Sequence, residues 1–172
     1  MNWLNKIFRK KPKRSQQIWL THQAQNSGDN RAWIASVSEN VGKLIAAGGS
    51  LAQAHPDALL SYYLNMYQQQ AAAGGFNAFV AANGWNEQLN KLIAHALHIC
   101  DAKEHLAHFQ NCCQTWAISD STTREQQTVL QAEGFHALPD SDQIHAAWLR
   151  RHAHTVFLSE AEIDQAIARL LN

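Results

Sequence analysis

Apolar residues recur at intervals of three and four along almost the whole chain, and no stretch alternates apolar and polar positions for more than a few residues. Such spacing places side chains on one face of an α-helix, whereas alternation is typical of a β-strand. The pattern therefore predicts an all-α fold, a compact multi-helix domain. The expected helices cover residues 29–47, 56–75, 76–83, 122–132, 141–157 and 159–171, and two more begin at Trp85 and Asp101.

Turn and capping residues support these boundaries. Glycine pairs at 48–49 and 74–75 are typical helix stops, and Pro56 suits the first turn of a helix. Ser159 and Glu162 have the spacing of a capping box, in which each side chain bonds the backbone amide of the other. Gly74 and Gly75 also permit a close helix–helix approach, so that the following phenylalanines enter the core directly after the turn.

Composition indicates one folded domain. The chain has 172 residues, of which 46% are hydrophobic and 16% charged, so it can bury a core of ordinary size. Three cysteines, two of them adjacent, do not suit a disulfide framework. Neither a membrane span nor a secretory signal is recognisable in the sequence. These features predict a cytoplasmic protein.

The charge is divided unevenly, and this division separates a leader, residues 1–14, from an all-helical domain, residues 15–172. The leader carries six basic side chains and no acid, whereas the domain has a net charge of −6. A mildly acidic domain with scattered cations disfavours nucleic-acid binding.

The leader combines apolar and basic residues in the manner of an interfacial helix, which would hold the protein at the anionic inner face of the membrane. Two alternatives stay open: the leader docks on the domain with its cations in solvent, or it binds nucleic acid or an acidic partner. The residues expected to contact membrane or partner are Trp3, Leu4, Lys6, Ile7, Phe8, Arg9, Lys10 and Lys11.

A local concentration of histidine and cysteine is the strongest hint of chemistry. His95 and His98, and again His105 and His108, have the i, i+3 spacing that could supply a metal from two helices. The pattern matches no known zinc spacing, so we predict no metal and no cofactor, with these histidines as polar surface residues. Nucleophile elbows, phosphate loops and dinucleotide fingerprints are absent from the sequence, but a cysteine paired with a histidine in space stays open.

The segment around the second glycine pair resembles a family of small bacterial helical proteins named for a DNA-mimic protein. The match is carried by an aromatic pair, then Gly-Gly-Phe, a further Phe and a later Asn. The resemblance implies a small helical domain and, by analogy with the namesake, acidic side chains that occupy a DNA-binding regulator. The residues that carry it are Tyr62, Tyr63, Gly74, Gly75, Phe76, Phe79 and Asn83.

Together these observations predict a non-enzymatic domain that binds another protein, either a regulator or a toxin domain that it neutralises as an immunity protein. A DNA-mimic inhibitor is one alternative. A metal- or thiol-dependent enzyme that uses the His/Cys cluster is another. The sequence leaves homodimerisation open and does not identify the partner.

Overall fold

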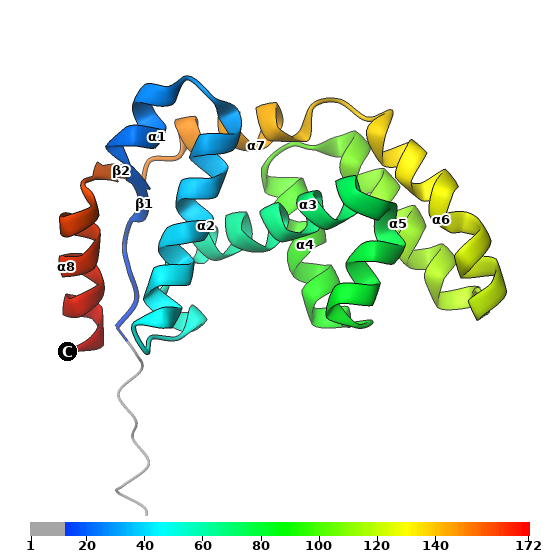
Figure 1. The fold of residues 1–172 in the computed structure, drawn as a ribbon, viewed down its shortest axis with the longest axis horizontal. Helices are drawn as coiled ribbons and strands as arrows, with labels where there is room; N and C mark the ends of the chain where they lie inside the picture. The colour runs from blue at the N-terminus through cyan, green and yellow to red at the C-terminus, as the bar shows by residue number, and fades with distance from the viewer. Residues whose placement is uncertain (1–12) are drawn as a thin grey trace, which may run out of the picture.

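The structure, a computed structural model, describes residues 13–172 and confirms the all-α fold (Figure 1). Its helices are joined by short connections, and two short strands accompany them. In chain order the elements are β1 (Ile18–Thr21), α1 (His22–Ser27), α2 (Asn30–Ala46), the short 3₁₀ helix η2 (Leu51–Gln53), α3 (Pro56–Asn83), α4 (Glu87–Ile99), α5 (Lys103–Ile118), α6 (Ser121–His136), α7 (Ser141–Arg151), β2 (Thr155–Leu158) and α8 (Glu160–Leu171).

The long helix α3 contributes to two clusters of buried side chains. It runs between the two ends of the molecule and so joins them (Figure 1). At one end, α3 packs with α4, α5 and α6 around Tyr67, Phe76, Phe79 and Phe109, whose rings meet mostly edge to face. At the other end, α2, α7, α8 and the strands enclose an aliphatic cluster that includes Ile34 and Leu149. Burial of these two apolar clusters is the main stabilising contribution to the fold.

The glycine pair in α3 forms a kink, and the second glycine has a backbone that other residues rarely adopt. Gly75 has φ 70° and ψ −168°, so the two predicted helices follow one another with no loop between them. A β-carbon on Gly75 would lie 2.8 Å from the backbone nitrogen of Ala132 in α6. The expected close helix approach is therefore confirmed, although Gly75 adopts an extended positive-φ conformation and not a left-handed cap.

The prediction of a helix over residues 141–157 is wrong in its last part. The observed helix α7 ends at Arg151, and residues Thr155–Leu158 form β2, which pairs in parallel with β1. Ile18 lies opposite Thr155 and Thr21 opposite Leu158. Four-residue strands that are half-buried or buried on both faces show no alternation, and the β-branched Thr155 and Val156 were the local indication of a strand.

Other helix boundaries differ from the expectation by a few residues. Asp101 does not start α5 but forms the preceding turn with φ 59°. Asn86 caps α4, so Trp85 lies outside that helix and is 42% exposed. The capping box of Ser159 and Glu162 is present as predicted. Of the leader, only Lys13 and Arg14 fall within the described residues.

Candidate functional site

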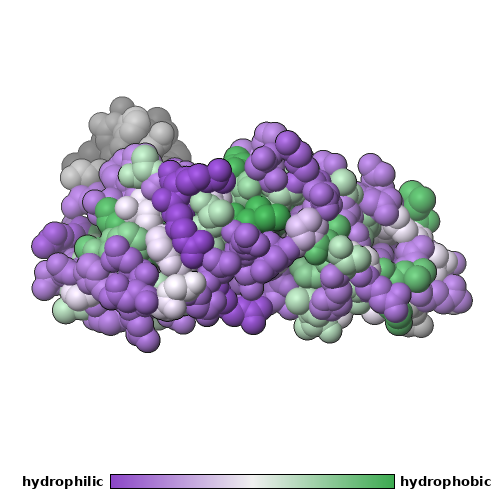
Figure 2. Space-filling view, turned by 90° about the horizontal axis from the view of Figure 1, so that it is seen from above, coloured by the Kyte–Doolittle hydropathy of each residue, from purple (hydrophilic) through white to green (hydrophobic). Residues whose placement is uncertain are grey.

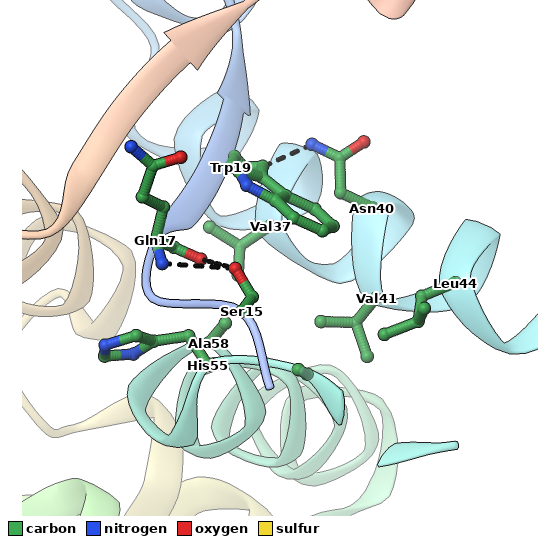
Figure 3. Close-up of a pocket in the computed structure, with 10 residues that line it drawn as sticks. Ser15, Gln17, Trp19, Val37, Asn40, Val41, Leu44, His55 and Ala58 are labelled. Carbon is green, nitrogen blue, oxygen red and sulfur yellow. Dashed lines mark hydrogen bonds between the residues drawn. The ribbon is translucent and has the colours of Figure 1, made fainter. Parts of the chain in front are cut away.

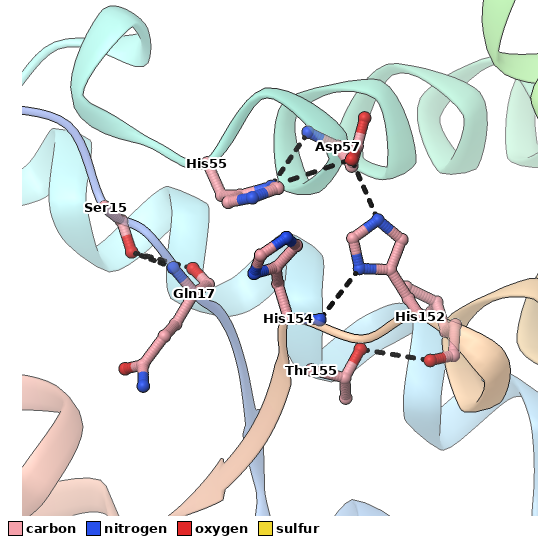
Figure 4. A network of polar contacts seen from close by, with 8 residues as sticks. Ser15, Gln17, His55, Asp57, His152, His154 and Thr155 are labelled. Carbon is pink, nitrogen blue, oxygen red and sulfur yellow. Dashed lines mark hydrogen bonds and ion pairs between the residues drawn. The ribbon is translucent and has the colours of Figure 1, made fainter.

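A cluster of three histidines and one aspartate lies where the N-terminus of α3 meets the loop between α7 and β2 (Figure 4). His55 and Asp57 come from the start of α3, whereas His152 and His154 come from the end of α7 and the loop that follows it. Residues 15–17, which precede β1, pass beside these rings (Figure 4). We call the side chains of His55, Asp57, His152 and His154 the imidazole cluster.

Asp57 and His152 form the strongest contact of the cluster. Nε2 of His152 donates to Oδ2 of Asp57 at 2.8 Å, and Nδ1 of the same ring accepts the backbone N–H of His154 at 3.3 Å. Both ring nitrogens of His152 are therefore engaged. The side chain of His152 is 14% exposed and that of Asp57 is 31% exposed, so water screens this pair only in part.

His55 is the N-cap residue of α3. Its Nδ1 accepts the backbone N–H of Asp57 at 3.2 Å, a role that Ser, Thr, Asp or Asn usually fills at a helix start. The Nδ1 atom also lies 3.9 Å from Oδ2 of Asp57. Because Nδ1 accepts, the proton of the neutral ring is on Nε2.

The three imidazole rings lie close enough to influence one another's charge. The ring centroid of His55 is 5.7 Å from that of His152 and 5.2 Å from that of His154, and the last two are 5.6 Å apart. Burial lowers the pKa of His55, and Asp57 opposes this shift, whereas His152, His154 and Arg14 add to it. His55 is therefore held in its neutral form near pH 7.

The two hydroxyls beside the cluster already bond backbone carbonyls, because Ser15 Oγ donates to the carbonyl of Gln17 at 2.7 Å and Thr155 Oγ1 donates to that of Leu149 at 3.0 Å. Over residues 13–172, no three His, Cys, Asp or Glu side chains are placed so that they could share a metal ion. The arrangement is that of a hydrogen-bonded structural network.

The enclosed cavity beside His55 is too small for a ligand (Figure 3). It has a volume of about 10 Å³ and is lined by Ser15, Gln17, Asn40, His55, Trp19 and surrounding aliphatic side chains. The Asn40 amide donates to the carbonyl of Trp19 at 2.9 Å and so fastens β1 to α2 (Figure 3). A cavity of this size holds at most one water molecule.

The four histidines predicted as weak metal candidates are not brought together. His95 and His98 are exposed on α4. His105 is buried on α5, where its Nε2 donates to the carbonyl of Pro139 at 2.8 Å. His108 lies on the side of α5 that faces α6, where its ring occupies the space left by Gly134. These positions indicate four separate structural or surface roles.

One thiol–imidazole contact does occur, between Cys112 and His108. The Sγ and Nε2 atoms are 3.6 Å apart. Burial raises the pKa of the Cys112 thiol to about 11 and lowers the pKa of His108. Both shifts favour neutral groups, whereas a cysteine nucleophile requires the thiolate. Cys112 is more deeply buried than the adjacent Cys113.

The residues of the Gly-Gly-Phe motif have packing roles. Phe76 and Phe79 are buried, and their ring centroids are 5.7 Å apart. The Asn83 amide donates to Gln70 Oε1 at 2.6 Å and to the carbonyl of Phe79 at 2.7 Å, so it connects the two sides of the kink. The rings of Tyr62 and Tyr63 meet edge to face on α3.

The leader residues expected to contact a membrane or partner, from Trp3 to Lys11, lie outside the described residues. Among residues 13–172, no helix has both the length and the apolar character required to cross a bilayer.

The sequence analysis missed the imidazole cluster because its two halves are far apart in the chain. The analysis favoured the histidines between residues 95 and 108. These residues are close in sequence, but their ring nitrogens do not come together in the structure. Two signals could have indicated the cluster: His-Pro-Asp at a helix start, and His-Ala-His directly before the β-branched residues of β2. Joining them requires the tertiary contact between the start of α3 and the end of α7.

Comparison with protein families gives a match over most of the domain. The DMP19-like protein family matches residues 52–165, which include the kinked helix, both halves of the imidazole cluster and the start of α8. No significant match is found among curated proteins or among solved structures. The matched region spans well over half of the chain, and the chain therefore belongs to the DMP19-like protein family.

Proposed function

We propose that this protein is a non-enzymatic protein-binding domain of the regulator-binding or inhibitor type, and that its partner docks on α6. The observation that carries the proposal is the exposure of three large apolar side chains to solvent. Ile118, at the end of α5, is 88% exposed, and Val129 and Leu130 of α6 are 63% and 68% exposed. We call these three residues the α6 surface. Figure 2 shows hydrophobic surface at the α6 end of the molecule.

Exposed aliphatic groups of this size are costly in water, and a partner that covers them would gain the free energy of their burial. The construction of α6 supports this assignment. Gln131 and Phe135 are its buried residues among the described side chains, and they face α3 and α5. Val129 and Leu130 therefore contribute little to the core, which makes a binding role the simpler account of their hydrophobic character.

Two tryptophans beside an arginine of α6, together with a groove that one of these tryptophans lines, add a second element suited to protein recognition. Trp85 stacks on Trp116 with ring centroids 6.4 Å apart and planes 8° apart. The guanidinium carbon of Arg124 lies 4.4 Å from the centre of the Trp116 ring. The groove itself, between α4 and α5, has a volume of about 540 Å³. Tryptophan and arginine are the side chains that most often dominate the free energy of protein–protein binding.

DNA mimicry is the second candidate, and membership of the DMP19-like family favours it. The placement of the acidic side chains indicates that charge contributes less to partner binding than DNA mimicry would require. Asp29, Asp120 and Asp140 each cap a different helix, and five further acids form ion pairs or local hydrogen bonds. The pairs are Asp57 with His152, Asp101 with Lys103, Asp142 with Arg31, Glu160 with Lys43, and Glu162 with Ser159.

Site-specific photo-crosslinking in the producing cells tests the proposal. A photoreactive residue at position 130 should yield a defined crosslinked protein, whereas the same residue at position 45 should not. Ile45 is a suitable control because it is 40% exposed and lies on α2, at the other end of the molecule. Identical products from both positions, or none from position 130, would contradict the proposal. Loss of the crosslink when duplex DNA is added would assign the partner to the DNA-binding proteins.

A further inference from the structure

The stretch of chain before β1 is held to the body by a few bonds around the imidazole cluster. The Ser15 amide donates to the carbonyl of Gln53 at 2.7 Å, and Arg14 Nε donates to that of Ala52 at 3.0 Å. The Ile18 amide then donates to the carbonyl of His154 at 2.9 Å, where β1 begins. The attachment of residues 13–17 therefore depends on where His154 and η2 are placed, and η2 ends two residues before His55.

The lone pairs of two rings in the cluster are used as hydrogen-bond acceptors at these places. Nδ1 of His55 accepts the Asp57 amide that opens α3, and Nδ1 of His152 accepts the His154 amide. A proton added to either ring must go to this Nδ1 atom, because Nε2 already carries one. It would then point at a backbone N–H and break the bond that positions Asp57 or His154.

Charge acts in the same direction. The groups that face His55 are Arg14 from the preceding segment, Asp57 from α3, and His152 and His154 from the end of α7 and its loop. Protonation of His55 would place a positive charge near Arg14, His152 and His154, with Asp57 as the single acid among these groups. His55 is largely buried, so the repulsion would be poorly screened.

We infer that the imidazole cluster is an acid-sensitive attachment, which holds residues 13–17 against the domain near neutral pH and releases them when the His55 ring is protonated. Proton binding determines how attachment changes with pH. Burial and the neighbouring cations lower the pKa of His55 in the attached state, whereas a detached, solvated ring has the ordinary value near 6.5. The detached state therefore binds protons more readily, and attachment weakens as the pH falls below about 6.5.

This inference does not depend on the proposed binding surface, which lies at the other end of the molecule. Its consequence concerns the leader, because residues 13–17 connect the four cations and four apolar residues between Trp3 and Lys11 to β1. Release of this segment would lengthen the tether between the leader and the domain. Acidification would thereby change which surfaces the leader can reach.

Amide hydrogen exchange of the full chain, followed by NMR between pH 7.5 and pH 5.0, tests the inference. The protection factors of the Ser15 and Ile18 amides should fall about tenfold or more over this range, because one titrating ring changes an equilibrium up to tenfold per pH unit. Amides in the middle of α3, such as that of Leu64, should keep a larger protection factor and so report global unfolding separately. Constant protection at Ser15 and Ile18 down to pH 5.0 would overturn the inference.

The matched variant is His55→Asn, because asparagine is a good N-cap but does not titrate. It should retain the protection of Ser15 at pH 7.5 and lose most of its pH dependence. An unchanged pH dependence would refute the role of His55. Should the variant fold poorly, the His55 ring signal of the unsubstituted chain provides the test: it must titrate below pH 6.5 and together with the loss of Ser15 protection. Titration without that loss would equally refute the role.

Discussion

The fully buried ring of His145 in α7 accepts a hydrogen bond from Ser61 of α3, with 2.8 Å between Nε2 and Oγ. Its Nδ1 donates to Gln68 Oε1 at 3.0 Å, so the ring joins α7 to α3 as a neutral group. Burial lowers the pKa of His145 to about 3. In the unfolded chain the same ring would have the ordinary value near 6.5.

Stability should consequently fall as the pH decreases from about 6.5 towards 3, because in this range the ring binds a proton in the unfolded chain but not in the native state. At 1.36 kcal/mol per pH unit, His145 alone should lower the free energy of unfolding by about 2 kcal/mol between pH 6.5 and pH 5. Urea unfolding at several pH values measures this slope. His145→Gln should reduce the slope, leaving a remainder from His55 and His108, whose pKa values are also lowered.

Gly75 provides a test of the kinked helix. Gly75→Val should destabilise the protein by more than about 1 kcal/mol, because the side chain would meet the backbone of Ala132 and would also be strained at positive φ. Gly84 is a close control, since its φ of 70° and ψ of 166° are almost the same but nothing lies within 4 Å of its missing β-carbon. Gly84→Val should therefore show the backbone strain alone. Equal losses at both positions in thermal unfolding would exclude the close contact with α6.

Local sequence signals predicted most of this fold. The positions of helices α2 to α8 followed from apolar spacing, whereas the short helices α1 and η2 were not predicted. The boundaries at Pro56, Gly48 and Ser159 followed from capping chemistry. β1 and β2 could not be found in the same way, since each has four residues and pairs with a partner more than 130 positions away. The imidazole cluster was missed for a related reason. Its rings belong to residues 55 and 152–154, whereas the prediction weighed histidines that were neighbours in sequence.

The interfacial role of the leader is a prediction from sequence alone. The full chain should sediment with vesicles rich in anionic lipid at low salt, and should do so less as salt increases, because the attraction to headgroups is screened. Replacing both Trp3 and Phe8 by Ser should weaken this binding strongly without changing the thermal midpoint. A lowered midpoint, with no vesicle binding by either form, would instead indicate that the leader packs on the domain.

The affinity of the crosslinked partner for variants of the α6 surface is the most direct test of the proposed function. We predict that the double substitution Val129→Gln and Leu130→Gln weakens binding about 30-fold, equivalent to about 2 kcal/mol, because two exposed contact residues lose their apolar surface while helical propensity is retained. Ile45→Gln should leave the affinity unchanged, and all forms should melt at similar temperatures. An affinity of the double variant within twofold of the unsubstituted protein would contradict the account.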